Sequence, residues 1–181
     1  MINYAIKPSY PIHDDNLALL FLDIAIKLCK PQKSICLILP SGAWLYNNNT
    51  LEYRKHLLQT YDVKKVIDFT HLSDVLFHGS ANVAVCTTIA QNQQPSKENL
   101  LHITIKRSNV AEKRAYFEID HYDFHKVNYD TALNNQFVWK ANLLGIGNRL
   151  LRLINRLYNL RSLEEYLEEK KKNNGWKFGE G

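Results

Sequence analysis

Glycine is scarce in most of the chain, and cysteine never occurs in a paired spacing. The only glycines among the first 140 residues are Gly42 and Gly79. A loop that wraps closely around a nucleotide-like cofactor needs glycine, because a Cβ atom would block the approach. The three cysteines, Cys29, Cys36 and Cys86, form no C-x-x-C pair. Neither a disulfide framework nor a zinc site is therefore expected.

Long apolar runs are missing as well. No stretch approaches the ~18 residues that a membrane span requires, and Met1–Pro11 lacks the apolar core of a signal peptide. With 181 residues, of which 45% are hydrophobic and 23% charged, the composition is that of one ordinary globular domain. The sequence thus predicts a cytoplasmic protein with a buried core.

Acidic residues are absent from one segment. Lys140–Arg161 carries five basic residues and no aspartate or glutamate, which accounts for the whole formal net charge of +5. Within this segment Arg149, Arg152 and Arg156 recur at helical spacing and share one face. Such a face either contacts DNA phosphates or is simply solvated. These three arginines are candidate DNA-binding residues.

Helices and strands alternate along the first half of the chain. Residues 17–28 are predicted to form an amphipathic helix capped by Asp14 or Asp15. Its expected apolar stripe consists of Leu17, Leu20, Phe21, Ile24, Ala25 and Leu28. Ile35–Leu39 is an unbroken apolar run, which is typical of a strand covered on both faces. Thr50 is the predicted cap of a second helix, "TLEYRKHLLQTY".

Two further strands, "VKKVIDF" and "NVAVCTTIA", complete an α/β pattern with parallel crossovers. The link from Asp68 to Asn82 has no long helix, so the third strand is expected to pair antiparallel. The segments "LLHITIKR" and "KRAYFEID" predict a β-hairpin extension. The last third predicts two helices, the second opened by a capping box from Ser162 to Glu165. The predicted fold class is α/β, with a partial Rossmann-like sheet and C-terminal helices.

The order of these segments resembles a known family. "NLALLFLDIAIKLCKPQKSICLILPSGAWLYNNNTLEYRKHLLQTYDVKKVIDF", followed by "VLFHGSANVAVCTTIA", is similar to the rear half of the catalytic domain of adenine-specific N6 DNA methyltransferases of type I and type IIG restriction-modification systems. The resemblance covers residues 17 to about 90. On it, Ile35–Leu39 is the fifth strand of a seven-stranded methyltransferase sheet, and the next two strands are its last pair.

The resemblance also implies a division of the chain. Residues 1–138 correspond to the rear half of the methyltransferase-like domain with its hairpin extension. Residues 139–181, with "KANLLG", "RLINRL", "SLEEYL" and "GWKFGEG", look like a helical connector toward a DNA-recognition domain that is absent from the chain.

Family members bind S-adenosylmethionine at a glycine loop after the first strand and grip the target adenine with an Asn/Asp-Pro-Pro-aromatic motif after the fourth. Neither motif is present in this sequence. Lys7–Tyr10 has the outline of the second motif, but a lysine ammonium cannot accept the adenine amino hydrogens. Gly145–Asn148 reads as a plain helix start. The resemblance therefore implies S-adenosylmethionine for a complete enzyme, and no catalytic, cofactor-binding or metal residues in this chain.

Three loop residues remain candidates for contact with DNA. Phe77 matches the family position whose aromatic ring stacks on the extruded adenine, although the ring could equally anchor its loop in the core. Asn47 and Asn48 follow the strand Ile35–Leu39 at the edge where open α/β sheets bind ligands. Plain surface-turn roles stay open for both asparagines. The cluster Asp120–His125 is expected to be a solvated turn and not a metal site.

Two function classes follow. The first is a fragment of a DNA adenine-N6 methyltransferase that is inactive alone; the second is a non-enzymatic DNA-binding or assembly module that retains the scaffold. In either case the strand Ile35–Leu39 loses its expected neighbour. An open apolar edge invites a homodimer, a complementing chain, or the chain's own N-terminal arm.

Overall fold

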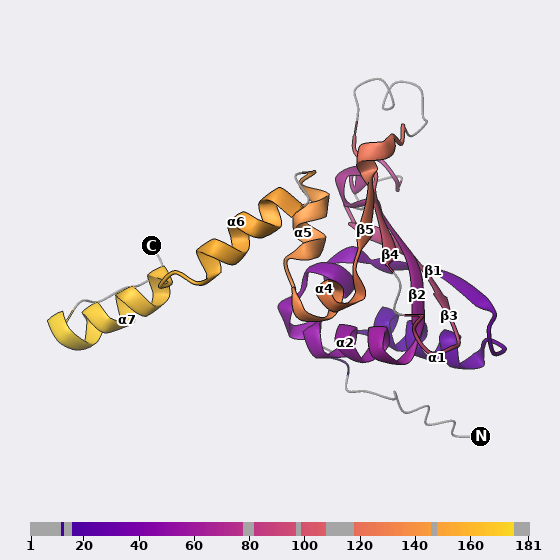
Figure 1. Ribbon diagram of the computed structural model, residues 1–181, viewed down its shortest axis with the longest axis horizontal. Helices are drawn as coiled ribbons and strands as arrows, with labels where there is room; N and C mark the ends of the chain where they lie inside the picture. Colours follow the sequence, from indigo (N-terminus) through magenta and orange to yellow (C-terminus); the bar gives the residue numbers. More distant parts are fainter. Residues whose placement is uncertain are drawn as a thin grey trace.

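A mixed five-stranded sheet with helices packed on it organises the chain (Figure 1). The computed structural model describes residues 12, 16–77, 82–96, 99–107, 118–145 and 148–175. The strand order is β1-β3-β2-β4-β5. The strands are β1 (Ser34–Pro40), β2 (Asp62–Asp68), β3 (Val85–Gln91), β4 (Leu100–Thr104) and β5 (Phe124–Val127). The helices are α1 (Leu17–Leu28), α2 (Leu51–Thr60), α4 (Tyr129–Asn134), α5 (Val138–Leu143), α6 (Asn148–Tyr158) and α7 (Leu163–Asn174).

The directions of the first three strands agree with the sequence. Both β1 and β2 pair antiparallel with β3, which lies between them. The strands β1 and β2 therefore run the same way, as a crossover through α2 requires. The predicted α/β class and the antiparallel pairing of β2 with β3 are confirmed.

The outer strands of the sheet differ from the prediction in one respect. Strand β4 pairs parallel with β2 on one side and antiparallel with β5 on the other. The partner of β4 is thus Phe124–Val127 and not the segment "KRAYFEID". Glu118–Asp120, at the end of that segment, is not in a strand, and its earlier residues lie outside the described part of the chain. Residues 124–127 are too few, and too mixed in polarity, to give a clear strand pattern.

The hydrophobic core lies on one face of the sheet. Helices α1, α2, α4 and α5 join the strands in one cluster, whose fully buried members include Leu22, Leu57, Val66, Cys86, Leu100 and Trp139. The other face presents one residue from each strand in a single cross-strand row: Ile38, Thr87, Ile67, Ile103 and Phe124. Ile38 is 69% exposed, and Cys36 on the same side of β1 is exposed too. The expectation that β1 is covered on both faces is therefore wrong for the described part of the chain.

Helix α1 buries a different face from the one predicted. Leu19, Leu22 and Ile26 are fully buried, whereas Leu17, Phe21 and Leu28 of the predicted stripe are largely exposed. The helix is apolar almost all the way round, so its periodicity does not select one face. The N-cap is Asn16, whose side chain accepts a hydrogen bond from the Leu19 amide at 3.2 Å. The cap is therefore Asn16 and not Asp14 or Asp15, two residues that lie outside the described ranges.

The last two helices extend away from the sheet as an arm (Figure 1). Helix α6 contacts α5 and buries Leu151, whereas α7 buries none of its residues. The predicted capping box is confirmed, since Ser162 and Glu165 each bond the other's backbone amide. Gly175, with a φ of 65°, ends α7 in the left-handed conformation that glycine favours. Each helix in the described ranges is too short or too polar to cross a bilayer.

We expect the buried face of α1 to dominate its contribution to stability. Leu22→Ala should lower the free energy of unfolding by about 3 kcal/mol, because it leaves a cavity in the core. The matched change Leu17→Ala, at a position that is 65% exposed, should alter it by less than about 0.5 kcal/mol. Urea unfolding followed by circular dichroism measures both. Equal losses would show that α1 is packed by a different face.

Candidate functional site

Two loops leave the sheet at the same edge, because β1 and β2 run in the same direction. After β1 the chain forms a wide helical turn, Gly42–Tyr46, and a short turn, Asn48–Thr50, before α2 begins. After β2 it forms the turn Thr70–Leu72 and continues toward β3. The carboxyl edge of parallel strands is where open α/β sheets bind ligands. This edge is the candidate functional site.

The side chain of Asp68, the last residue of β2, links both loops. Its carboxylate is fully buried and accepts hydrogen bonds from the Tyr46 hydroxyl, the Thr70 amide at 2.9 Å and the Thr70 hydroxyl at 2.5 Å. The Thr70 hydroxyl also lies 2.7 Å from the Ser41 hydroxyl. Two residues of the segment after β1, Ser41 and Tyr46, therefore bind it to the end of β2 and the turn that follows.

His102 of β4 extends this network toward the helices. Its Nδ1 lies 3.2 Å from the side-chain amide of Asn142 on α5. Because that amide nitrogen donates, Nδ1 accepts and the ring hydrogen is placed on Nε2. Nε2 lies 3.6 Å from the Asp68 carboxylate, too far for a hydrogen bond but close enough for electrostatic attraction. The ring edge packs on Trp139, with centroids 5.2 Å apart. The network therefore ties α5 to the sheet.

The protonation states of this network follow from its surroundings. Burial alone raises the pKa of Asp68, but His102, Thr70 and Tyr46 outweigh burial and hold that pKa below its ordinary value. Burial, together with the Asp68 charge, raises the pKa of Tyr46. Asp68 is therefore charged and Tyr46 neutral at physiological pH. Since Asp68 has no exposed surface, it orders the loops and is not placed to react with a substrate.

Arg54 of α2 holds the loop after β1 in place through hydrogen bonds to its backbone. Its guanidinium is almost fully buried and donates from Nη1 to the carbonyls of Trp44 and Leu45, at 2.9 and 2.8 Å. Burial lowers the pKa of Arg54 to about 10. The hydroxyl of Thr50 donates to the carbonyls of Ala43 and Asn47, at 2.7 and 2.9 Å. Thr50 thus occupies the predicted cap position of α2, but its side chain binds the loop instead of the helix.

Sequence reasoning did not find Asp68, His102, Tyr46 or Arg54. For Arg54 a signal exists: it lies in the buried stripe of α2 beside Tyr53, Leu57 and Leu58, where a charged residue needs backbone or acidic partners. The other three are far apart in the sequence and show no local pattern.

The predicted loop residues lie on segments that leave this edge. Asn47 is half-buried, and its side-chain oxygen accepts a hydrogen bond from the Asn49 amide at 2.9 Å. Asn48 is exposed. Phe77 lies on the connection between β2 and β3, with 42% of its surface exposed, and is not part of the core cluster. The DNA-contact roles of these residues stay predictions.

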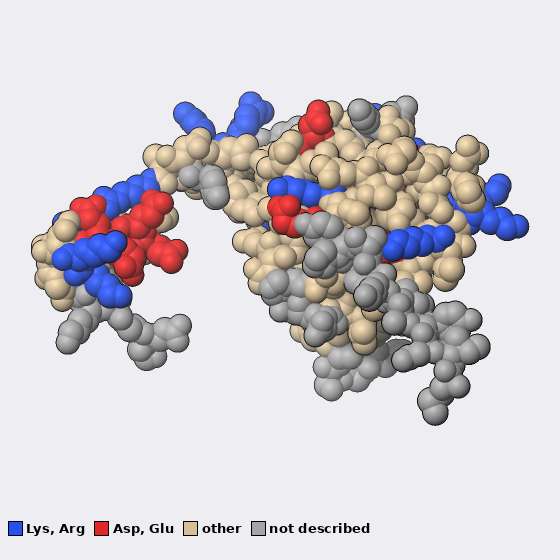
Figure 2. Space-filling model, turned by 90° about the horizontal axis from the view of Figure 1, so that it is seen from below, with Lys and Arg blue, Asp and Glu red and all other residues tan. Residues whose placement is uncertain are grey.

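The predicted arginines lie elsewhere. Arg149, Arg152 and Arg156 are exposed on α6. Figure 2 shows basic side chains standing alone on the inner part of the arm, whereas acidic and basic side chains mix at its far end. The arginine face therefore belongs to the arm and not to the carboxyl edge.

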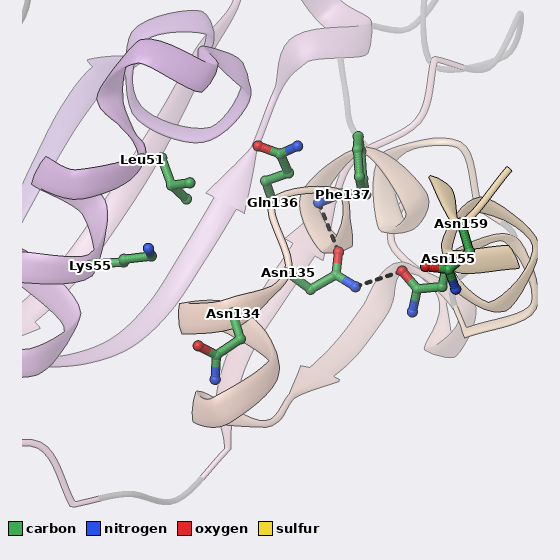
Figure 3. Close-up of a pocket in the computed structure, with 8 residues that line it drawn as sticks. All are labelled: Leu51, Lys55, Asn134, Asn135, Gln136, Phe137, Asn155 and Asn159. Atoms are coloured by element: carbon green, nitrogen blue, oxygen red, sulfur yellow. Dashed lines mark hydrogen bonds between the residues drawn. The ribbon is translucent and has the colours of Figure 1, made fainter. Parts of the chain in front are cut away.

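A pocket of about 510 Å³ lies on the helical side of the sheet (Figure 3). Its walls come from α2, from the connection between α4 and α5, and from α6. Five of its lining residues carry side-chain amides: Asn134, Asn135, Gln136, Asn155 and Asn159. No sequence pattern pointed to this pocket, because its residues come from three separate segments.

The glycine of the loop after β1 and the possible metal ligands of the described residues bear on the expected lack of a cofactor or metal site. A Cβ built at Gly42, the glycine of the loop after β1, would meet nothing within 4 Å. The backbone of this glycine is therefore not packed against another part of the described protein. Among the described residues, no group of three His, Cys, Asp or Glu side chains could hold a metal ion.

Comparison with known proteins shows which family part of the chain resembles. Residues 4–76 match the family model of the Eco57I restriction-modification methylases. This segment is similar to a restriction-modification methylase. The resemblance expected from the sequence is thereby confirmed. A search of curated proteins found no significant match.

Three solved structures of type I restriction-modification proteins are similar to parts of this chain. A modification subunit assigned to a type I restriction enzyme from Vibrio vulnificus YJ016 has 14% identity and a TM-score of 0.43, over 51% of this chain and 20% of that one. A chain of a type I restriction-modification complex has 15% identity and a TM-score of 0.46, over 92% and 38%. The EcoKI M protein has 9% identity and a TM-score of 0.41, over 72% and 26%. The chain spans less than half the length of each of these relatives.

The Asp68 network should make stability depend on acid pH. Because folding lowers the pKa of Asp68, its charged form stabilises the fold above the ordinary carboxyl pKa of 3.8. That stabilisation is lost as the pH falls toward the folded-state pKa. Asp68→Asn should lower the free energy of unfolding by about 3 kcal/mol at pH 7, and the difference from the wild type should shrink below about pH 4.

The measurement is denaturant unfolding of both proteins between pH 3 and pH 7, with exposed Asp130→Asn as the control. The control should stay within about 0.5 kcal/mol of the wild type. A difference for Asp68→Asn that does not change with pH would rule out the charged carboxylate as the stabilising group.

Proposed function

We propose that the chain is the rear part of a DNA adenine-N6 methyltransferase of a restriction-modification system. It acts with S-adenosylmethionine only when completed by a segment that carries the cofactor loop and the adenine-gripping motif, and it is inactive alone. The observation that carries the proposal is the match of residues 4–76 to restriction-modification methylases, in a chain whose sequence lacks both motifs.

The surface around β1 supports a completing segment. Leu17, Phe21 and Leu28 of α1 are exposed, as are Cys36 and Ile38 of β1. Strand β1 is an end strand of the described sheet, paired only with β3. Exposed apolar residues on a helix beside β1 and on the uncovered face of β1, next to an open strand edge, are typical of an interaction surface. The proposed partner is a complementing chain or chain segment that supplies the neighbouring strand, with a homodimer as the alternative occupant.

In the completed enzyme each candidate residue has a proposed role. Phe77 stacks on the extruded adenine, and Asn47 and Asn48 form the lip of the DNA cleft. Arg149, Arg152 and Arg156 contact phosphates. Residues 139–181 connect the domain to a DNA-recognition domain. The enzyme would work in the cytoplasm, where the free thiols Cys29, Cys36 and Cys86 remain reduced.

A second candidate is a DNA-binding or assembly module without enzymatic activity. It is favoured by the net basic segment Lys140–Arg161. Basic side chains can bind DNA phosphates without a cofactor.

A completion experiment separates the two candidates. Calorimetric titration of the isolated chain with S-adenosylmethionine should show no binding on either view. Expressed in frame with its upstream coding sequence, the protein should bind the cofactor and leave N6-methyladenine in duplex DNA, detected by mass spectrometry of the digested nucleosides. Cofactor binding by the isolated chain, or an upstream sequence without either motif, would refute the methyltransferase proposal.

The role of Phe77 is tested in the completed enzyme. Base stacking on an aromatic ring contributes about 1–3 kcal/mol, so Phe77→Ala should reduce kcat/KM for DNA methylation roughly tenfold or more. The dissociation constant for S-adenosylmethionine should not change. Val75→Ala, on the same connection and similarly exposed, is the control. Equal effects of the two changes would assign Phe77 a packing role only.

A further inference from the structure

The amide-lined pocket on the helical side lies apart from the carboxyl edge. Figure 3 shows its three walls: Leu51 and Lys55 on α2, residues 134–137 at the end of α4 and in the connection to α5, and Asn155 on α6 with Asn159 just after that helix. One lining residue, Phe137, is aromatic. The volume of about 510 Å³ is within the range of small-molecule and nucleotide sites.

Only part of the amide chemistry is used within the protein. Asn135 donates to the side-chain oxygen of Asn155 and accepts from the Phe137 amide, both at 2.9 Å. These two bonds fix Asn135 and join the connection to α6. In the described structure no hydrogen bond involves the side chains of Gln136 or Asn159. Their amides therefore remain available, each offering two donor hydrogens and one acceptor oxygen.

Positive charge adjoins the amides. Asn155 follows Arg152 by three residues on α6, and Asn159, in the turn that ends this helix, follows Arg156 by three, so the amide wall and the arginine face are neighbours. On the opposite wall Lys55 lies at the pocket and pairs with Glu52 at 2.8 Å. The basic segment that carries the whole net charge of the chain thus borders the pocket along one side.

This combination selects a class of ligand. A metal ion would need carboxylate or imidazole ligands, which the lining lacks. A simple anion would use the basic groups and leave the amides without a role. A nucleotide uses both, since amides match the mixed donors and acceptors of base edges and arginines bind phosphates. A concave site admits a base only when that base is unpaired.

We propose that this pocket binds an unpaired nucleotide of a DNA strand whose neighbouring phosphates lie along the arginine face of α6. The site is distinct from the target-adenine position at the carboxyl edge. It rests on the proposed function only for the identity of the polymer as DNA. Gln136 and Asn159 contact the base edge, and Arg156 contacts a phosphate.

The test is the fluorescence anisotropy of a labelled single-stranded oligonucleotide and of the matching duplex, titrated with the full chain at several salt concentrations. The double variant Gln136→Ala/Asn159→Ala should weaken single-strand binding roughly tenfold. Its duplex affinity and its salt dependence should equal those of the wild type. Arg156→Gln should weaken binding to both DNA forms and lower the salt slope by about one.

Matched controls separate the pocket from general effects. Gln94→Ala removes an exposed amide from the connection between β3 and β4 and should leave all affinities unchanged. Since Gln136 and Asn159 make no described hydrogen bonds, the double variant should keep the wild-type circular dichroism spectrum and unfolding midpoint.

Three results would overturn the proposal: no binding of the single strand by the wild type, wild-type affinity in the double variant, or an equal loss for strand and duplex in that variant. The measurement needs no S-adenosylmethionine and no methyl transfer. Failure of the methyltransferase proposal would therefore leave this result readable, and failure here would leave the methyltransferase proposal standing.

Discussion

The buried carboxylate of Asp68 is the constraint on which the arrangement of this protein depends. A charge without solvent is costly unless donors surround it, so Tyr46 and Thr70 must stay within hydrogen-bonding distance and His102 must remain beside it. Tyr46 fixes the loop after β1, and Thr70 fixes the start of the connection that carries Phe77. His102 in turn contacts Asn142, which places α5 against the sheet. One charge thus positions three segments that are distant in sequence.

Helix α2 connects the loop after β1 to the amide-lined pocket. Two consecutive residues of α2 serve different sites. Arg54 donates hydrogen bonds to the carbonyls of the loop after β1, and Lys55 lines the amide-lined pocket. The pocket's other walls, residues 134–137 and α6, adjoin α5, the helix that Asn142 ties to His102. The carboxyl edge and the pocket are therefore built on the same rigid elements, although they lie on separate surfaces. A site on such elements keeps its geometry better than one on a free loop.

The sequence predicts the strands β1 to β4, the helices α1, α2, α6 and α7, and the antiparallel pairing of β3, because each has a strong local pattern. The sequence does not predict those features that depend on tertiary packing. Helix α1 is apolar all round, so its buried face depends on which sheet it meets. The apolar run of β1 predicts cover on both faces, yet Ile38 is exposed in the described structure. The polar groups of the site, Asp68, His102 and Asn142, meet only through the tertiary fold, and local pattern cannot bring them together. Only Arg54 carries a readable signal, a charge within a buried helical stripe.

The exposed apolar surface around β1 and the arginine face of α6 lie toward different ends of the sheet. The exposed apolar residues surround β1, the first strand in the order, whereas α5, on which the arm is built, packs against β4 near the other end. A segment that paired with β1 and covered Leu17 and Phe21 would approach from the first end. DNA on the arginine face of α6 would approach from the second. Because the strand order separates these two surfaces, the proposed completing segment and the proposed DNA strand at the pocket would not compete for the same residues.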